Sequence, residues 1–520
     1  MTQMLKSSGA MGAATVLSRL LGLARELVYA AFMGTGTVAG TFYVAFTIPN
    51  LFRRLLGEGA LTAAFIPIFK EKERVAGDAE MWHAANAVIS GLIVSAAAIV
   101  AVVLLGLTVA LAWGPFTGYT RLLMELLRIM FPYMFLVCLA ATFMGMLNAR
   151  GHFFIPSLGA ALLNVVMIAS VLWLAPRMGE TLDRQVFGLA IGVLLAGVVQ
   201  AAFQVPTLRR EGYRFRWVSP WRDPTVREVI RKMLPASVGV AAFQINVLIT
   251  QLLAFGVYVP IVAVFNFAVR LMEFPQGVFG ISLATYLLPT LSGLAAEKNY
   301  GAFRSTLRQG LEYLLFANLL ASVFLVILAE PIIRLLFERR EFGSGSTSDV
   351  SVALACLAPG LVAFSAVNIL ARAFYALGDT RTPMRISVFC LGVNLLFAVL
   401  LIQPYRAAGL GLANTATSFL NLGLLVYSLR RKLGRLELGQ MRAGLFALLP
   451  AALLAGIVGW WLSDLWESRL GHVGLWLKFG SVFAPVLPAT LIYWGTAYGL
   501  GVPAARDVAN LLVKRFRQST

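Results

Sequence analysis

Long apolar runs constrain this chain of 520 residues more than any other feature. About 20 consecutive apolar residues are needed for a helix to cross a bilayer, and lipid offers no partners to an unpaired backbone, so each run must be helical. Fourteen spans are predicted, at 10–33, 36–56, 83–112, 122–148, 156–176, 186–208, 234–256, 258–291, 309–331, 351–376, 384–403, 407–429, 443–464 and 474–500. The sequence therefore predicts an all-α polytopic membrane protein with about fourteen transmembrane helices.

The charged residues agree with this class. They make up only 13% of the chain, against roughly 25% in soluble proteins. A net charge of +19 would suggest nucleic-acid binding in a soluble chain, but here the Lys and Arg residues cluster in short segments between the spans. The side that carries both termini has 27 of them and the other side about nine. The positive-inside rule therefore predicts cytoplasmic termini, and nucleic acid is not an expected partner.

The two halves of the chain resemble each other. Three residues with spacings of 19 and 5 recur 227 positions later, Pro132, Gly151 and Pro156 and then Pro359, Gly378 and Pro383. Gly188 with Gly409, and Pro67 with Pro289, repeat at offsets of 221 and 222. An even number of spans per repeat predicts two parallel pseudo-symmetric six-helix lobes plus two extra helices. Transporters built from such repeats bind substrate between the repeats.

The predicted boundaries follow from this repeat. Residues 1–208 form the N-terminal lobe, 209–233 a basic linker, 234–431 the C-terminal lobe, and 432–520 the two extra spans with a cytoplasmic tail. Arg alternates with Trp, Tyr and Phe in the linker, which favours a position on the anionic leaflet. A plain solvated loop is the alternative.

Ionisable residues inside the spans gather in three motifs, although such groups are costly at membrane depth and mark functional sites. The motifs are SRLLGLARELV with Arg19, Arg25 and Glu26; PNLFRRLLGEGAL with Arg53, Arg54 and Glu58; and VRLMEFPQG with Arg270 and Glu273. Arg54 with Glu58 and Arg270 with Glu273 have helical spacings that allow pairing. The other three arginines have no equally obvious local partner.

Our interpretation is a cationic cavity that binds an anion through Arg19, Arg25, Arg53 and Arg270. A guanidinium donates two parallel hydrogen bonds to a phosphate. Glu26 is expected to orient an arginine, and Arg54, Glu58 and Glu273 to support the site. The small residues Ser18 and Gly22 allow close helix approach. The alternative for each arginine is a structural ion pair, or a position at the interface with the side chain reaching the headgroups.

The remaining reactive residues do not form a catalytic or metal-binding pattern. Cys138, Cys356 and Cys390 lie in apolar segments without CxxC spacing, and His83, His152 and His472 are far apart in sequence. We therefore predict no catalytic residue, no metal site and no cofactor.

At these motifs the sequence resembles a known family. SRLLGLARE, FYVAFTIPNLFRRLLGEGALTAAFIPIF and RLMEFPQGVFG are similar to the MurJ (MviN) lipid II flippases of the MOP transporter superfamily. The resemblance implies a protein of peptidoglycan biosynthesis in the bacterial inner membrane. It implies that lipid II, the undecaprenyl-pyrophosphate-linked disaccharide pentapeptide, crosses to the periplasmic leaflet by alternating access. In that family the cavity arginines match Arg19, Arg25, Arg53 and Arg270, and acids match Glu26 and Glu58. Membrane lipids and other cell-wall synthesis proteins are the further partners implied.

Two departures from the family bear on mechanism. Gly40 stands where some members have an aspartate, and spans seven, eleven and twelve contain no Asp or Glu, so a sodium site of the kind found in some members is not expected. Three other functions stay open. They are a flippase for another polyprenyl-linked glycan, a cation-coupled small-molecule exporter of the same superfamily, and a membrane-embedded glycosyltransferase. A basic cavity argues against export of cations, and the lack of an acidic catalytic loop argues against an enzyme.

Overall fold

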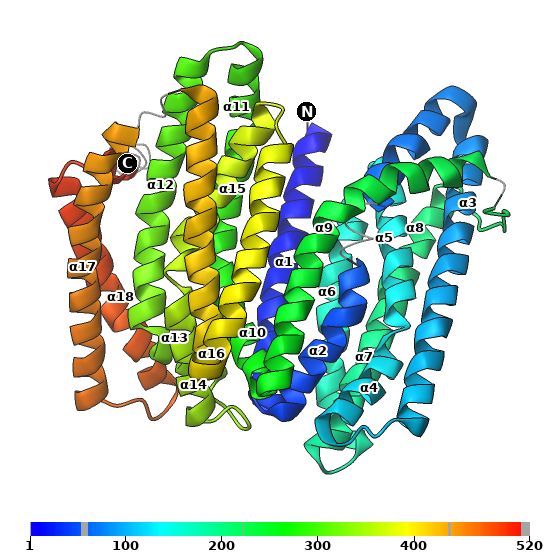
Figure 1. The fold of residues 1–520 in the computed structure, drawn as a ribbon, viewed down its shortest axis with the longest axis horizontal. Helices are drawn as coiled ribbons and strands as arrows, with labels where there is room; N and C mark the ends of the chain where they lie inside the picture. Colours follow the sequence, from blue (N-terminus) through cyan, green and yellow to red (C-terminus); the bar gives the residue numbers. More distant parts are fainter. Residues whose placement is uncertain (1, 54–60, 222, 435–437, 511–520) are drawn as a thin grey trace. The chain divides into compact units, whose positions relative to one another are not determined.

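The computed structural model describes residues 2–53, 61–221, 223–434 and 438–510, and within these ranges it is helical and has no strand (Figure 1). The chain divides into two compact units, Met1–Ala263 and Val264–Thr520. The first unit contains α1 (Thr2–Met33), α2 (Thr37–Phe52), α3 (Leu61–Trp113), α4 (Gly118–Met130), α5 (Tyr133–Ala149), α6 (Phe154–Ala169), the π-helical η2 (Ser170–Leu174), the 3-10 helix η3 (Ala175–Met178), α7 (Leu182–Ala202), α8 (Val205–Arg210) and α9 (Pro224–Val257).

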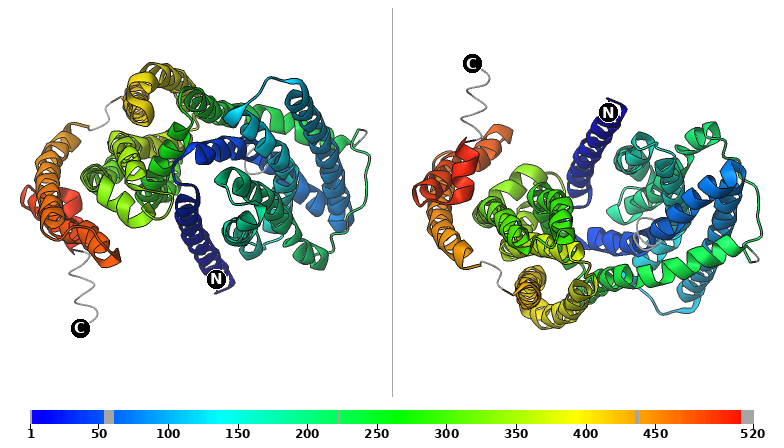
Figure 2. Two further views of the ribbon diagram at one scale, coloured as in Figure 1. Left: turned by 90° about the horizontal axis from the view of Figure 1, so that it is seen from below. Right: turned by 90° about the horizontal axis from the view of Figure 1, so that it is seen from above.

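The helix α10 (Pro260–Pro275) runs across the division between the units. The second unit continues with the π-helical η4 (Gln276–Ile281), α11 (Ser282–Ala296), α12 (Tyr300–Ile327), α13 (Ala329–Phe337), α14 (Ser344–Leu357), α15 (Gly360–Ala376), α16 (Arg381–Leu433), α17 (Leu438–Arg469) and α18 (Leu475–Gly499). In each unit most of the helices run roughly side by side, so the end-on views look along their axes (Figure 2).

A helix lies at each predicted span, which confirms the all-α membrane class. Of the described helices, nine are long and apolar enough to cross a membrane, and a tenth span results if α14 and α15, bent by 46°, are taken together. One of the nine, α16, contains two predicted spans and folds back at Arg406, where φ is 50°. Shorter apolar helices, α2 and residues 243–257 of α9, cover two further spans, and α1 covers the first.

Prolines interrupt three of the spans. Pro275 ends α10, and the π-helical turn η4 follows it directly, so the predicted irregularity of the eighth span is confirmed. Pro132 and Pro359 directly precede α5 and α15 and mark breaks inside two predicted spans. A proline removes one backbone donor and clashes with the preceding turn, yet residues 118–149 still form one candidate span, and α14 and α15 form another with a bend of 46°.

The internal repeat is also present in the backbone. Gly151 and Gly378 both have positive φ, 87° and 73°, and the prolines five residues later are each the third residue of a helix, α6 and α16. Gly188 and Gly409 both press against the preceding helix, since an added Cβ would lie 2.6 Å from the Ala175 Cα and 2.2 Å from the Leu401 carbonyl oxygen. The repeated sequence positions therefore have repeated structural roles.

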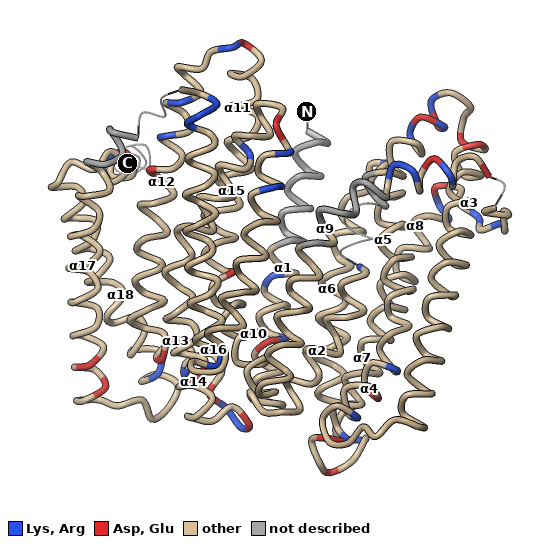
Figure 3. Tube along the Cα trace, viewed as in Figure 1, with Lys and Arg blue, Asp and Glu red and all other residues tan. Residues whose placement is uncertain are grey.

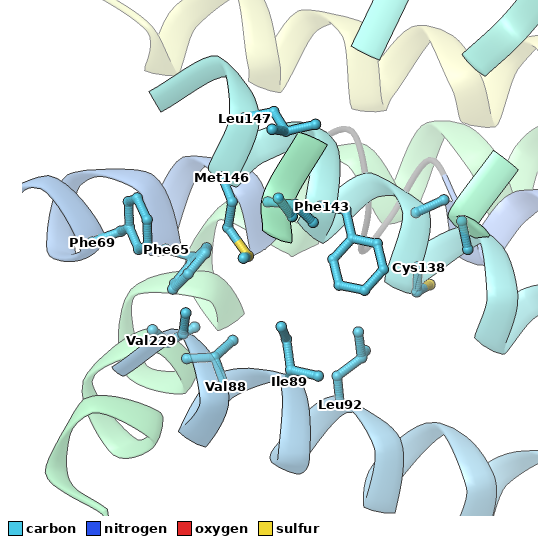
Figure 4. Close-up of a cluster of buried hydrophobic side chains, with 14 of the residues drawn as sticks. Phe65, Phe69, Val88, Ile89, Leu92, Cys138, Phe143, Met146, Leu147 and Val229 are labelled. Atoms are coloured by element: carbon cyan, nitrogen blue, oxygen red, sulfur yellow. The ribbon is translucent and has the colours of Figure 1, made fainter. Parts of the chain in front are cut away.

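Apolar side chains hold each unit together. In the first unit, α3, α5 and α9 bury a cluster that includes Phe65, Met146 and Val229 (Figure 4). Cys138 lies in this cluster and Cys390 is buried in the second unit, while Cys356 is half-buried; all three thiols are free, as predicted. In the second unit, α17, α18 and residues 502–505 share a cluster that packs on α12. Charged residues concentrate near the helix ends (Figure 3).

The segment from Lys70 to Glu80, which lies between the second and third predicted spans, is helical and part of α3. The chain turns at Gly77, where φ is 81°. Arg150 holds this turn, because its Nη1 atom lies 2.5 Å from Glu73 Oε1 and 3.4 Å from Asp78 Oδ1. Periodicity did not reveal this contact because the partners are more than 70 residues apart.

Equivalent loops of the two units each carry a contact between an acid and a basic residue, with the two residue types in exchanged positions. In the first unit, His152 Nε2 lies 2.8 Å from Glu211 Oε1 at the end of α8. In the second, Lys432 Nζ donates to Asp379 Oδ2 at 2.7 Å. Hydrogen bonds from His152 and then Arg150 lower the pKa of Glu211, and bonds from Lys432 and Thr382 lower the pKa of Asp379. The repeat therefore preserves the contact, although the acid and the basic residue have exchanged positions between the two units.

Candidate functional site

The first two helices build a charged centre around Arg25 and Glu26. Arg25 Nη2 donates to Glu26 Oε1 at 2.5 Å, and the two side chains are only 15% and 6% exposed. The Tyr43 hydroxyl lies 3.3 Å from the other carboxylate oxygen, Oε2. The Arg25 guanidinium also lies over the ring of Tyr29, 5.5 Å from its centroid. Glu26 therefore orients an arginine, as the sequence predicted.

Local sequence explains why these groups meet. Gly34, with φ of 58°, reverses the chain between α1 and α2. Tyr29 packs edge-on against Phe42 and Tyr43 at centroid distances of 5.9 and 6.5 Å, which fixes α2 beside the end of α1. The aromatic contacts thus bring Tyr43 to a carboxylate 17 residues earlier in the chain.

Small residues of α1 face α6. Asn164 Nδ2 donates to the Ser18 carbonyl oxygen at 3.2 Å, and a Cβ added at Gly22 would lie 3.6 Å from the same nitrogen. The close approach predicted for Ser18 and Gly22 is therefore observed. This packing leaves room for the amide of Asn164 against the α1 backbone.

Arg25 retains unused donor capacity. Its Nε atom is buried, and within the described part of the chain it has no hydrogen-bond partner. A guanidinium has five N–H donors, and a buried donor that stays unsatisfied costs roughly 1–3 kcal/mol. An anion that accepted from this face would remove that cost. The expectation that Arg25 lacks a local partner was wrong, because Glu26 and Tyr29 both contact it.

Arg19 differs from Arg25. It is exposed, and among the described residues it makes no ion pair and no hydrogen bond. It lies six residues before Arg25, or about 9 Å along α1. Its guanidinium is therefore available to a ligand without first breaking a protein contact.

Arg53 directly follows α2. Its Nε atom donates to Asn50 Oδ1 at 2.8 Å, and the residue is half-buried. The expected lack of a local partner was wrong here too, because an asparagine three residues earlier shares its helix face. The pair predicted between Arg54 and Glu58 lies outside the described residues.

The second unit contributes Arg270 on α10. Its Nη1 atom donates to Glu273 Oε2 at 2.8 Å, which confirms the predicted pair. Both side chains are substantially exposed, at 40% and 47%. Arg25 and Arg270 are thus each paired with an acid of their own helix.

The surroundings of Gly40 and Glu125 limit what these two positions can contribute to the site. Gly40 has no room for a carboxylate, because a Cβ there would lie 2.3 Å from the Val259 carbonyl oxygen. Glu125 accepts from Arg121 Nε at 3.0 Å. Within the described residues no group of three or more His, Cys, Asp or Glu side chains is placed to hold a metal ion.

Sequence reasoning missed Tyr29, Tyr43, Asn50 and Asn164 as members of this centre. Tyr29 and Asn50 carried a usable signal, since they lie four and three residues from their arginines on a helix. Tyr43 and Asn164 carried none, because only the folded chain brings them to α1.

The fold is that of transporters in the MOP superfamily. A solved structure described as the lipid II flippase MurJ in an inward closed conformation matches with a TM-score of 0.75 and 20% identity, over 93% of this chain and 98% of that one. An inward-facing multidrug resistance MATE family transporter of the MOP superfamily matches with a TM-score of 0.65 and 17% identity, over 83% of this chain and 99% of that one. These matches define the class by its fold alone, a polytopic helical membrane protein with the fold of these solved transporters.

Sequence comparison identifies the family within this class. The model of the lipid II flippase MurJ family matches residues 29–479. A probable lipid II flippase MurJ of Vibrio cholerae is 33% identical over 99% of this chain and 97% of its own length. The lipid II flippase MurJ of Burkholderia cenocepacia is 33% identical over 86% of this chain and 88% of its own. The chain belongs to the MurJ family of lipid II flippases.

Proposed function

We propose that this protein moves lipid II from the cytoplasmic to the periplasmic leaflet of the bacterial inner membrane by alternating access. Its membership of the family and the names of its relatives support this substrate. The observation that carries the proposal is the Arg25–Glu26 centre, a nearly buried cation with a buried Nε donor to spare. A protein that needed only a structural ion pair would gain nothing from the spare donor.

The anion in this proposal is the pyrophosphate of the substrate. It carries roughly two negative charges, and charge-assisted bonds to a guanidinium fork are about twice as strong as neutral ones. Arg19, Arg25 and Arg53 supply the donors of the first unit, and Glu26 holds Arg25 in one orientation. Arg270 is proposed as a fourth ligand on the basis of its motif. Glu273, Arg54 and Glu58 are proposed to support these arginines.

The membrane potential is a suitable driving force. Moving one elementary charge across the membrane is worth about 2.3 kcal/mol per 100 mV. Because the cytoplasm is at negative potential, this energy favours outward movement of the negatively charged lipid. We further propose that both termini are cytoplasmic, from the excess of Lys and Arg on that side. The proposed lobes are 1–208 and 234–431, with the linker 209–233 and the extra segment 432–520. Transport here requires no covalent step, so we propose no enzymatic activity.

Complementation of a flippase-depleted strain tests this function. We expect R19A, R25A and R270A each to abolish growth and lipid II accessibility at the outer surface, with normal levels of inserted protein for R19A and R270A. R121A is the matched control, because Arg121 is exposed and, within the described part of the chain, forms its ion pair with Glu125 of its own helix. Full complementation by all three variants would refute the arginine site. Normal lipid II accessibility in depleted cells, with another polyprenyl-linked glycan retained inside, would favour the second candidate substrate.

A further inference from the structure

The basic linker is fixed to the first unit at a defined height along α3. The chain leaves α8 through Gly212, with φ of 91°, and buries Tyr213, whose ring centroid lies 5.5 Å from that of Trp82. Asn86 Nδ2 then donates to the Arg214 carbonyl oxygen at 3.1 Å, and the Val218 backbone N–H donates to Ser90 Oγ at 3.2 Å. Residues 213–219, here called the strap, are therefore held along α3 although they form no helix.

This height corresponds to the headgroup layer of a bilayer. The part of α3 without Lys, Arg, Asp or Glu extends over 81–113, about 50 Å of helix, which is slightly more than the thickness of a bilayer including its headgroups. Trp82 lies about 2 Å, Asn86 about 8 Å and Ser90 about 14 Å into this run. The hydrocarbon core begins roughly 5–8 Å below the outer edge of the headgroups. The strap, which runs from the level of Trp82 to that of Ser90, therefore crosses the headgroup layer and its boundary with the acyl chains.

The strap presents two kinds of side chain at this level. Phe215, Trp217 and Trp221 just beyond it are 50%, 58% and 72% exposed. Arg214 and Arg216 alternate with them, are exposed, and make no ion pair within the described part of the chain. The acids that flank the strap are engaged elsewhere, because Glu211 contacts Arg150 and His152, and Asp223 is buried and caps α9 by accepting from the Thr225 N–H at 2.8 Å. No acidic side chain on the strap therefore competes for these arginines.

We propose that the strap is a binding site for anionic phospholipids, with Arg214 and Arg216 on the phosphate and Trp217 and Trp221 against the upper acyl chain. Aromatic rings favour the membrane interface, and each basic group near an anionic surface strengthens binding. Since the strap connects α8 to α9, its lipid ligand would hold the connection between the two halves of the repeat at a fixed depth. The proposal does not depend on which substrate is transported.

Tryptophan quenching in nanodiscs tests the proposal on the full-length protein. Phosphatidylglycerol or phosphatidylcholine, each brominated on its acyl chains, is incorporated at equal mole fraction. The signal of Trp217 and Trp221 is obtained by subtracting the spectrum of W217F/W221F. We expect stronger quenching by the brominated phosphatidylglycerol, and a loss of preference of about 30-fold in R214Q/R216Q.

R209Q/R210Q is the matched control, because these two arginines end α8, are exposed, and lie outside the strap. It removes the same charge from the same side of the protein, and we expect it to retain the preference. Equal quenching by the two lipids, or an equal loss in R209Q/R210Q, would overturn the proposal. The latter result would mean that only the general positive charge attracts the lipid.

Discussion

Removing the carboxylate of Glu26 tests whether a buried ion pair holds Arg25. Loss of one partner from such a pair costs about 3–5 kcal/mol, because the other charge stays buried without compensation. The substitution E26Q keeps an acceptor for the Tyr43 hydroxyl, so the change isolates the charge. Arg25 is 15% exposed and keeps its contact with the Tyr29 ring, worth about 0.5–2 kcal/mol. We therefore expect a loss near the lower limit, about 3 kcal/mol.

The measurement is unfolding by sodium dodecyl sulfate titration in mixed micelles, followed by complementation of the flippase-depleted strain. The double variant R25Q/E26Q separates structure from transport, because it removes both charges and leaves no buried ion unpaired. We expect it to regain most of the stability lost in E26Q and still fail to support growth. Stability of E26Q within about 0.5 kcal/mol of the parent protein would refute the buried pair. Growth with R25Q/E26Q would show that transport does not need Arg25.

Three further predictions concern packing and pH. G409A should destabilise the protein by about 1–3 kcal/mol, because the added Cβ would lie 2.2 Å from the Leu401 carbonyl oxygen. G423A in the same helix is the control, since its added Cβ would meet open space and should not destabilise the protein. Both variants are measured by the sodium dodecyl sulfate titration. Because the pKa of Glu211 is lowered in the folded protein, its ionised carboxylate stabilises the fold fully at pH values above the unfolded pKa near 4.5. This stabilisation is lost as the pH falls through the pKa of the folded protein. The difference in melting temperature between the parent protein and E211Q should shrink over that window; a constant difference would contradict it. C390S should complement normally, because Cys390 is a free thiol in a packed segment, and lost growth would give it a role beyond packing.

Sequence alone determined the class and most of the architecture. Apolar runs of bilayer length must become helices, because an unpaired backbone has no partner in lipid. This reasoning placed a helix at each predicted span, and the repeated spacing paired Gly151 with Gly378, which share a positive φ. The motifs around Arg25 and Arg270 also sufficed to indicate the family. Local spacing correctly paired Arg270 with Glu273.

Only the tertiary structure decided which groups meet across the turns of the chain. Tyr43 reaches Glu26 because aromatic packing sets α2 against α1, and no periodicity encodes that approach. The close contact of Gly40 with Val259 likewise excludes a carboxylate by the path of a distant backbone. Hydrophobic patterning specifies which face of a helix is buried, but not the neighbour that it is buried against. The composition of the charged centre depends on that neighbour.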